Sequence, residues 1–359
     1  DWYAEQGIQL HLGAQVSSLD AVAHRLNLAD RSRVAYDRLL LATGGRPFVP
    51  PCGGTDKEGV FTLRTLEDAL AIKAYAQKVS RAIVIGGGLL GLETARALHT
   101  AGLNVTVVEF FPYLLPRQLD PEGAEVLQTL LEAQGLQIIT GAATESILGD
   151  VDADCIRLKD GRIVEGELVL FSTGIRSKVE LAQAVGLDVN RGIVVDEHLR
   201  ARWDGGQPAE DIFAAGDAAE FEGRVYGIIP PAIEQARVAA ANMVTPGSAT
   251  YQGTLPSTTL KVAGAELTSL GESVLEADSD PDRLRSAAST DRVIQLRYAD
   301  PANGRYRKLV LRDGRLVGAI LLNDTQRVRP ITQLIDRGVD VSEHAKRLLD
   351  DDFDLKSLL

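Results

Sequence analysis

The stretch from residue 81 to 109, RAIVIGGGLLGLETARALHTAGLNVTVVE, restricts the folds open to this chain more than any other. Its apolar start predicts a buried strand, its middle has apolar residues at helical spacing up to Gly102, and its end predicts a second strand. Gly86, Gly88 and Gly91 form a G-x-G-x-x-G motif between the first strand and the helix. In this context the glycines permit a tight turn, the approach of a pyrophosphate to backbone N–H groups, and close helix–strand packing. The stretch therefore predicts a dinucleotide-binding βαβ unit.

The second predicted strand ends at Glu109, 23 residues after Gly86. A carboxylate at this place accepts hydrogen bonds from the ribose hydroxyls of the adenosine half and repels a 2′-phosphate. The neighbours Phe110 and Phe111 supply no arginine for such a phosphate, so the sequence favours NADH over NADPH. The alternative interpretation of Glu109 is a solvated acid at the end of a strand.

The chain also contains an internal repeat with an offset of 130 positions. LLLATGGRP at 39–47 corresponds to VLFSTGIRS at 169–177, so Gly44 matches Gly174. In both copies a turn-rich segment joins two short alternating segments, which predicts a β-hairpin that leads into a final apolar strand. Repetition on this scale indicates two related domains.

The first copy has no glycine motif ahead of it. Gly174 follows Gly86 by 88 residues, so the equivalent motif for Gly44 would precede residue 1. We expect that the first strand, glycine loop and helix of the first domain are absent, and that the chain is an internal fragment or a partial gene model of a longer protein. Residues 1–20 would then form the tail of the first domain, as 131–148 form the tail of the second.

A third signal is the segment DIFAAGDAAEF at 211–221, an apolar strand that ends in Gly216 and Asp217. Such a turn places a small residue and a carboxylate beside a ligand, although Ala-Gly-Asp is also common in ordinary turns. The helix predicted at 231–243 begins with Pro231 and directs its N-terminal dipole toward negative charge. The position of this turn in the order of motifs favours a ligand-binding turn.

Composition excludes several classes of protein. The net charge of −12 argues against a nucleic-acid binder, because phosphate neutralisation requires basic surface. No apolar run reaches the length of a membrane-spanning helix, and no signal peptide is visible. Cys52 and Cys155 lack C-x-x-C spacing and the 5 histidines are scattered, so neither a disulfide framework nor a metal site is expected. We predict a cytoplasmic protein that binds no membrane.

Residues 255–359 are predicted to form a separate α+β domain. Five alternating segments are typical of strands, and two helical patterns follow them, at about 324–338 and 342–349. The acidic segment at 276–283 is interpreted as a solvated loop rather than as a partner-binding patch.

Taken in order, LLLATGGRP, VIGGGLLGLE, VLFSTGIRS and DIFAAGD resemble the motifs of the pyridine-nucleotide disulfide oxidoreductase superfamily, flavoprotein reductases with two dinucleotide-binding folds. The resemblance covers nearly the whole chain. More narrowly, GIIPPAIEQARVAAANM and YQGTLPSTTLKVAGAELTSLGE resemble the FAD- and NADH-binding part of assimilatory NAD(P)H nitrite reductase large subunits and rubredoxin-reductase-like proteins.

The resemblance implies an α/β fold with two Rossmann-like nucleotide-binding domains, the first of them incomplete. Each carries a β-meander insertion, and a small α+β C-terminal domain follows. The implied FAD-binding domain comprises 1–52 and 205–250, and the NAD(H)-binding domain comprises 53–204. Residues 255–359 would form a cap that covers the flavin side and contacts partners or subunits.

The resemblance also implies site residues. Those placed near FAD by their turns are Thr43, Gly44, Arg46, Gly216 and Asp217. Those placed beside the isoalloxazine ring are Ile229, Pro230, Ala232 and Ile233. Asp217 would hydrogen-bond the ribityl-phosphate portion, and the helix N-terminus would stabilise a reduced anionic flavin.

A second group of residues is assigned to the nicotinamide dinucleotide: Gly86, Gly88, Leu89, Leu90, Gly91, Glu109 and Gly174. Glu93 matches a carboxylate that in relatives lies near the nicotinamide and holds a lysine, so Glu93 is the candidate catalytic residue. The alternative interpretation of Glu93 is an acid in the first turn of the helix, where the dipole favours it.

The implied activity is hydride transfer from NAD(P)H, with NADH favoured, to FAD and onward to an acceptor, as in the diaphorase part of a nitrite reductase. The alternative within this class is an NADH-rubredoxin reductase or an NADH oxidase. The alternative from another class is a non-catalytic nucleotide-binding or interaction fragment without FAD. The implied partner is an electron-acceptor protein or a downstream iron–sulfur and sirohaem domain, with a homodimer as a further option.

Overall fold

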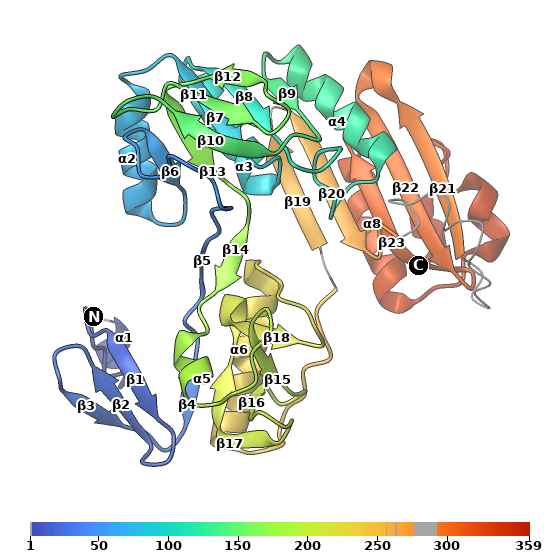
Figure 1. Cartoon of the computed structure of the whole chain (residues 1–359). Coiled ribbons are helices and arrows are strands. Elements are labelled where there is room, and N and C mark those ends of the chain that lie inside the picture. The colour runs from blue at the N-terminus through green and yellow to red at the C-terminus, as the bar shows by residue number, and fades with distance from the viewer. Residues whose placement is uncertain (1, 256, 263, 276–292) are drawn as a thin grey trace. The chain divides into compact units, whose positions relative to one another are not determined.

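A computed structural model describes residues 2–255, 257–262, 264–275 and 293–359, and Figure 1 shows how their helices and strands are arranged. The acidic segment predicted as a loop at 276–283 lies outside the described residues. None of the described helices combines the length and the apolar composition that a membrane crossing requires.

The chain divides into two compact units. Unit 1 comprises residues 1–46 and 175–254, and unit 2 comprises residues 47–174 and 255–359. The sequence predicts that the second dinucleotide domain ends at residue 204, whereas the structure assigns 175–204 to unit 1. The reason is strand pairing, because two of the three strands in this segment, Ile193–Val195 and Arg200–Arg202, belong to the sheet of unit 1.

Unit 1 is built on a five-stranded sheet. Its strand order is β18 (Ala219–Phe221), β15 (Ile193–Val195), β16 (Arg200–Arg202), β17 (Pro208–Ala214) and β4 (Leu39–Leu41). The helices of this unit are α1 (Trp2–Glu5), α5 (Glu180–Ala184), η1 (Gly216–Ala218) and α6 (Ile229–Val244). Alanine and other apolar side chains of β17 and α6, such as Ala214 and Ala239, pack into one core. Because β4 and β17 are parallel, both end at the same sheet edge.

Unit 2 contains a fully parallel five-stranded sheet. Its strand order is β6 (Val60–Thr62), β13 (Leu168–Phe171), β7 (Arg81–Ile85), β8 (Asn104–Val108) and β9 (Gln137–Ile139). The helices that accompany it are α2 (Leu66–Ala76), α3 (Leu89–Thr100) and α4 (Pro121–Ala133). Runs of buried apolar residues on β7, β8 and β13 are typical of parallel strands that are covered on both faces.

Each unit also carries a three-stranded meander. One consists of β1 (Val16–Asp20), β2 (Arg25–Leu28) and β3 (Arg33–Ala35), and the other of β10 (Thr144–Leu148), β11 (Cys155–Leu158) and β12 (Ile163–Glu165). Arg25 pairs with Ala35 in the first, and Cys155 pairs with Glu165 in the second, at the repeat offset. The first pair of strands in each meander has an irregularity in register at the same place. The predicted repeat and its hairpins are confirmed.

The C-terminal domain has an antiparallel sheet. Its strand order is β19 (Ser257–Val262), β20 (Ala265–Gly271), β23 (Arg315–Leu322), β22 (Arg305–Arg312) and β21 (Val293–Asp300). The helices are η3 (Pro301–Asn303), α8 (Thr325–Arg337), η4 (Ser342–Arg347) and η5 (Leu355–Leu358). The predicted helix at 342–349 is instead the short 3₁₀ segment η4, a form that short connecting turns commonly adopt.

The two faces of the C-terminal sheet bury different cores. Along β23, Ile320 and Leu322 belong to the core shared with α3 and α4, whereas Ala319 and Leu321 belong to the core under α8. This alternation follows from the two-residue period of a strand. Figure 1 shows the sheet beside α4. The C-terminal sheet and the parallel sheet of unit 2 are therefore joined by one continuous apolar core.

Candidate functional site

The glycine loop lies between β7 and α3 and has the geometry of a phosphate cradle. Gly86 has a φ of +115°, and a Cβ added to it would lie 2.3 Å from the carbonyl oxygen of Ser172. A Cβ on Gly91 would lie 2.0 Å from the carbonyl oxygen of Gly86, so helix and strand approach as closely as backbone allows. Beside Gly88, the N-cap of α3, a Cβ would meet only open space. No side chain of the described residues caps α3, which leaves its first N–H groups for an anion.

Glu109 follows β8 directly and is buried, with 6% of its surface exposed. Its Oε2 accepts a hydrogen bond from the N–H of Gly87 at 2.5 Å, and its Oε1 accepts one from the N–H of Phe111 at 2.8 Å. The alternative of a solvated strand-end acid is wrong, because the carboxylate is bonded to the glycine loop itself. Each carboxylate oxygen has capacity for a further donor, such as a ribose hydroxyl.

The segment 110–119 packs directly against the glycine loop. A Cβ on Gly87 would lie 2.5 Å from Cδ2 of Leu114, and the N–H of Leu115 donates to the carbonyl oxygen of Gly87 at 3.3 Å. Both leucines are fully buried. No role is predicted for this segment from the sequence, although the adjacent leucines after Glu109 indicate that part of it is buried.

Gly174 lies at the same sheet edge as the glycine loop. Strands β13 and β7 are parallel, with Phe171 opposite Ile85, so the turns after them are neighbours. Gly174 has a φ of +97° and faces open space. Leu90 is exposed at the start of α3, and Leu89 is half-buried. The predicted dinucleotide residues are thus brought to one edge of the sheet.

Glu93 is an exposed residue of α3. The helix begins at Leu89, so Glu93 is its fifth residue, and the first turn contains no acid. The alternative interpretation of Glu93 as a first-turn acid is therefore wrong. A role beside the nicotinamide stays a prediction.

In unit 1 the turn after β17 contacts the start of α6. Gly216 has a φ of +74°, its N–H donates to Oε1 of Gln235 at 2.8 Å, and a Cβ on it would lie 3.6 Å from Cβ of Ala232. The carbonyl of Asp217 accepts from the Ser177 hydroxyl at 2.6 Å. Gln235, which is 1% exposed and joins the predicted turn to the predicted helix, is not among the predicted site residues.

The N-terminus of α6 combines polarity with exposed apolar surface. Its N-cap, Ile228, provides no side-chain hydrogen bond, and prolines occupy the first turn. Ile229 is 74% exposed and Ile233 is 46% exposed. A helix N-terminus flanked by exposed apolar side chains fits an aromatic ring that becomes negative on reduction. These residues therefore fit the isoalloxazine end of a flavin.

Thr43 and Gly44 are fixed by hydrogen bonds in unit 1. The Thr43 hydroxyl donates to the carbonyl of Lys178 at 2.6 Å, and the N–H of Lys178 donates to the carbonyl of Gly44 at 2.9 Å. In unit 2 the same pair of bonds recurs at the repeat offset, from Thr173 to the carbonyl of Phe48 and from the N–H of Phe48 to Gly174. Both threonine–glycine turns are therefore rigid.

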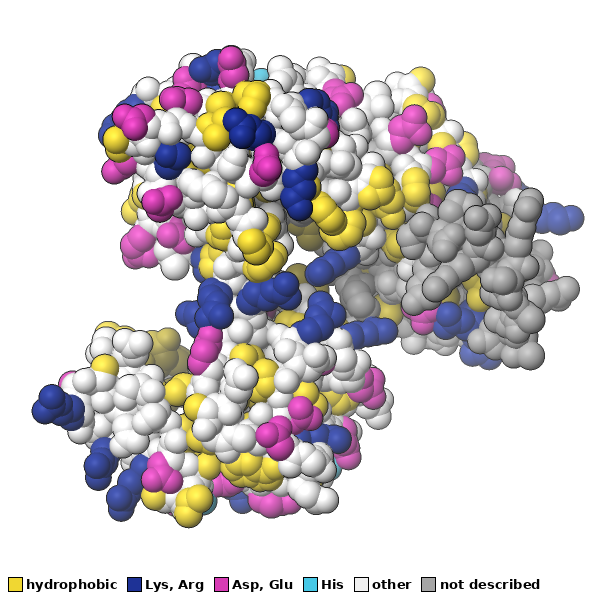
Figure 2. Space-filling model, viewed as in Figure 1, with side chains coloured by type: hydrophobic (Ala, Val, Ile, Leu, Met, Phe, Trp, Pro, Cys, Tyr) yellow, Lys and Arg dark blue, Asp and Glu magenta, His cyan; other side chains and the backbone are white. Residues whose placement is uncertain are grey.

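Arg46 lies on β5 (Gly45–Pro47), which pairs with β14 (Ile175–Ser177). It forms an ion pair with Glu180. Figure 2 shows Lys and Arg side chains gathered over these strands, where Arg46, Arg176 and Lys178 are exposed. This is an area of positive charge on an acidic chain, suited to a negatively charged ligand.

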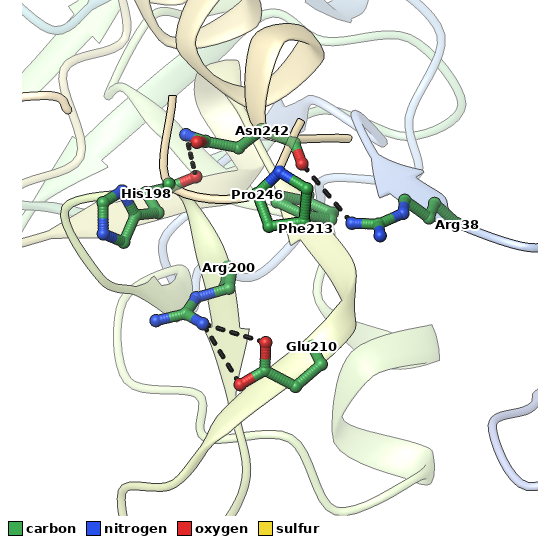
Figure 3. Close-up of a pocket in the computed structure, with 8 residues that line it drawn as sticks. Arg38, His198, Arg200, Glu210, Phe213, Asn242 and Pro246 are labelled. Atoms are coloured by element: carbon green, nitrogen blue, oxygen red, sulfur yellow. Dashed lines mark hydrogen bonds and ion pairs between the residues drawn. The ribbon is translucent and has the colours of Figure 1, made fainter. Parts of the chain in front are cut away.

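A small cleft in unit 1 lies near the other end of α6 (Figure 3). Arg38 there donates to the carbonyl of Asn242 at 3.4 Å, and Arg200 is bonded to Asp196 and Glu210 at 2.8 and 3.0 Å. Asn242 lies ten residues beyond Ala232, about 15 Å along the helix. We assign no cofactor to this cleft, because its arginines are paired and it is remote from the Gly216 turn.

Neither cysteine has the character of a redox thiol. Burial raises the pKa of Cys52 and the pKa of Cys155, which disfavours the reactive thiolate. Within the described ranges, no three His, Cys, Asp or Glu side chains are grouped to hold a metal ion.

The sequence profile of the pyridine nucleotide-disulphide oxidoreductase family matches residues 3–242. The chain belongs to this family. The rubredoxin NAD+ reductase C-terminal domain matches residues 256–339. FAD and NAD(P)H are the cofactors of the family. This confirms, at the level of the family, both cofactors expected from the sequence. It also confirms the expected class, the FAD-dependent NAD(P)H oxidoreductases.

Relatives of this family are similar over nearly the whole chain. A Bacillus subtilis NAD(P)H nitrite reductase is 36% identical over 96% of this chain, and an assimilatory nitrate reductase electron transfer subunit of the same species is 34% identical over 98%. This chain covers only 40% and 43% of those proteins. The ferredoxin reductase for the CYP199A2 system of Rhodopseudomonas palustris has a TM-score of 0.82 at 26% identity, over 99% of this chain and 83% of that one. The predicted fold class is confirmed.

Proposed function

We propose that this chain is the NADH- and FAD-binding module of a reductase, and that the favoured whole protein is a nitrite reductase. The observation that carries the proposal is the buried Glu109 carboxylate, which is bonded to Gly87 beside the uncapped N-terminus of α3. When bound, NADH supplies a hydride and FAD accepts it and passes electrons on.

The residues of unit 2 bind and orient the nicotinamide dinucleotide. The N–H groups at the start of α3, next to Gly88, hold the pyrophosphate, and Glu109 accepts the ribose hydroxyls. Gly174 lets the backbone turn approach the nicotinamide ribose. Glu93, exposed on α3, is the proposed catalytic residue, placed near the nicotinamide.

The residues of unit 1 bind the flavin. Thr43, Gly44 and Arg46 would hold it from the end of β4, and Asp217 would hold its ribityl-phosphate portion. The N-terminus of α6, from Ile229 onward, would hold the isoalloxazine ring and stabilise negative charge there. Unit 1 is accordingly the FAD-binding domain and the parallel sheet of unit 2 the NAD(H)-binding domain.

The proposed acceptor is an iron–sulfur protein or a downstream iron–sulfur and sirohaem domain. The identity to nitrite reductases supports it, as does the rubredoxin reductase C-terminal domain at 256–339. An NADH oxidase or rubredoxin reductase is the second candidate, favoured by 31% identity to a Methanocaldococcus jannaschii NADH oxidase. A cytoplasmic location and a homodimer stay predictions.

The deciding experiment uses the 359-residue chain incubated with FAD and freed of unbound flavin. We expect retained flavin absorption that bleaches on addition of NADH and about tenfold less readily with NADPH. A chain that binds NADH but retains no flavin would instead be the non-catalytic nucleotide-binding fragment. The variant Glu93→Gln is expected to bind NADH unchanged and to bleach flavin more slowly.

A further inference from the structure

A cluster of charged and polar side chains is buried inside unit 2, between α4 and the C-terminal sheet. We call it the Asp120 cluster; its buried members are Asp120, Tyr306 and Lys308, and Arg297, whose side chain is 42% exposed, lies at its edge. The hydroxyl of Tyr306 donates to Oδ2 of Asp120 at 2.7 Å, and the same oxygen lies 3.3 Å from Nζ of Lys308 and 3.4 Å from Nε of Arg297. The side chains of Lys308 and Asp120 are 0% and 2% exposed. Removing one partner from such a buried pair is costly, because the other charge stays buried alone.

Asp120 is also the N-cap of α4. Its Oδ1 accepts a hydrogen bond from the N–H of Gly123 at 3.1 Å. A Cβ on Gly123 would lie 2.8 Å from the ring of Tyr306, so the first turn of the helix fits directly against β22. One carboxylate therefore fixes both the start of α4 and its position on the C-terminal sheet.

A short path of direct contacts leads from Asp120 to the glycine loop. The N–H of Leu119 donates to the carbonyl of Leu115 at 2.9 Å, and the N–H of Leu115 donates to Gly87 at 3.3 Å. Leu115 has a φ of +53°, a conformation that is unfavourable for leucine and persists only where the surroundings hold it. The surroundings here are the shared core, to which Leu114, Leu115 and Leu119 all belong.

We propose that the Asp120 cluster positions the NADH site: it lets the C-terminal sheet hold segment 110–119 against the glycine loop, so that the C-terminal domain raises dinucleotide affinity through the protein. The inference rests on the proposed function, because it takes the glycine loop as the NADH site. Asp120, Tyr306 and Lys308 are positioning residues in this scheme.

The test compares variants of the full chain. Asp120→Ser keeps an oxygen that can cap α4, but it removes the negative charge and is too short to accept the hydrogen bond from Tyr306. Lys308→Met removes the opposite charge. Tyr306→Phe removes one hydroxyl and leaves the fold intact for measurement. We expect Asp120→Ser to bind NADH about tenfold more weakly and to exchange amide hydrogens faster across 110–119. Tyr306→Phe should show a smaller change in the same direction.

Arg327→Met is the matched control. Arg327 is another buried cation of the C-terminal domain, but it donates to the carbonyl of Leu348 on the α8 side of the sheet. This variant should be less stable yet bind NADH normally, with unchanged exchange at 110–119. In a double-mutant cycle, Asp120→Ser combined with Lys308→Met should lose less affinity than the sum of the two single variants.

Either of two results would overturn the inference. The first is that all three cluster variants bind NADH within about twofold of the unaltered protein. The second is that amide hydrogens at 110–119 exchange equally fast in Asp120→Ser and Arg327→Met. Hydrogen exchange needs no dinucleotide, so it separates this inference from the proposed function. Where the unaltered chain binds no NADH, faster exchange at 110–119 in Asp120→Ser but not in Arg327→Met still supports the packing of this segment by the Asp120 cluster. Failure of the unaltered chain to bind NADH contradicts the proposed function itself.

Discussion

Gly88 and Gly91 belong to the same motif, yet the structure places different demands on them. A Cβ on Gly91 meets the Gly86 carbonyl oxygen at 2.0 Å, whereas a Cβ on Gly88, which has an ordinary φ of −79°, meets nothing within 4 Å. Gly91 is therefore required by the fold, and Gly88 is required only by a ligand that approaches the backbone.

The variant Gly88→Ala should therefore unfold at the same temperature as the unaltered protein and bind NADH at least about tenfold more weakly. Gly91→Ala should weaken NADH binding and, unlike Gly88→Ala, should also lower the unfolding temperature, because a backbone atom must move. Thermal unfolding followed by titration with NADH distinguishes the two variants. Unchanged NADH affinity in a stable Gly88→Ala protein would mean that the pyrophosphate lies elsewhere.

The buried carboxylate of Glu109 supports a prediction on cofactor preference. Glu109→Gln removes the negative charge that repels a 2′-phosphate, so the ratio of NADPH to NADH dissociation constants should fall by about tenfold. Fluorescence titration with both dinucleotides measures that ratio. Glu93→Gln, which neutralises an exposed acid on α3, is the control and should leave it unchanged.

At the scale of elements, residue patterns in the sequence predict a strand, turn or helix correctly where that element depends on its own residues. The glycine loop, both meanders and the five C-terminal strands were predicted from alternation, turn residues and helical spacing. The domain boundary at Gly174 and the support of the glycine loop by Leu114 were not. The boundary depends on which distant strands pair, and a single sequence carries no signal for that. The adjacent leucines after Glu109 indicate burial, but they do not indicate what they pack against.

The segment after α6 leads to a prediction on alkaline stability. Tyr251 is buried, and its hydroxyl is bonded to Thr254 at 2.7 Å. Burial raises its pKa from 10.0 to about 12. Below pH 10 both states keep this proton, whereas between pH 10 and 12 the unfolded state loses it while the folded state keeps it. The contribution of Tyr251 to stability is therefore present below pH 10 and is lost as the pH rises to about 12.

Chemical denaturation at a series of alkaline pH values tests this effect. Across that window the unaltered protein should lose roughly 2–3 kcal/mol more unfolding free energy than Tyr251→Phe does. Other tyrosines and lysines titrate in both proteins and cancel in the difference. Parallel pH profiles for the two proteins would show that the tyrosine keeps an ordinary pKa in the fold.

At the scale of the whole molecule, the cores divide as the units do. The core around Ala214 lies within unit 1, and the core that joins α3 and α4 to Leu267 and Leu322 lies within unit 2. We expect two unfolding transitions in calorimetry. NADH should stabilise unit 2 by about 2.7 kcal/mol when its concentration is a hundred times its dissociation constant. The unfolding temperature of unit 2 should therefore rise, and that of unit 1 should stay unchanged.

Leu322→Ala identifies the transitions, because it should destabilise unit 2 by about 2–5 kcal/mol. The transition whose temperature it lowers should be the one whose temperature NADH raises. Leu41→Ala, in the core of unit 1, is the matched variant and should lower the other. A single transition that both variants shift equally would contradict independent cores.

The shared core of unit 2 has a consequence for synthesis on the ribosome. Its parallel sheet and helices are complete in the nascent chain by residue 174, but Leu260, Leu267 and Leu322, which cover α3 and α4, are translated later. At about 5–20 residues per second, the apolar faces of these helices stay uncovered for about 7–30 s. Unit 1 has its last core residue, Tyr251, well before that. Chaperones that recognise exposed apolar surface should therefore meet this protein during translation at α3 and α4, and release it only once β23 has been made.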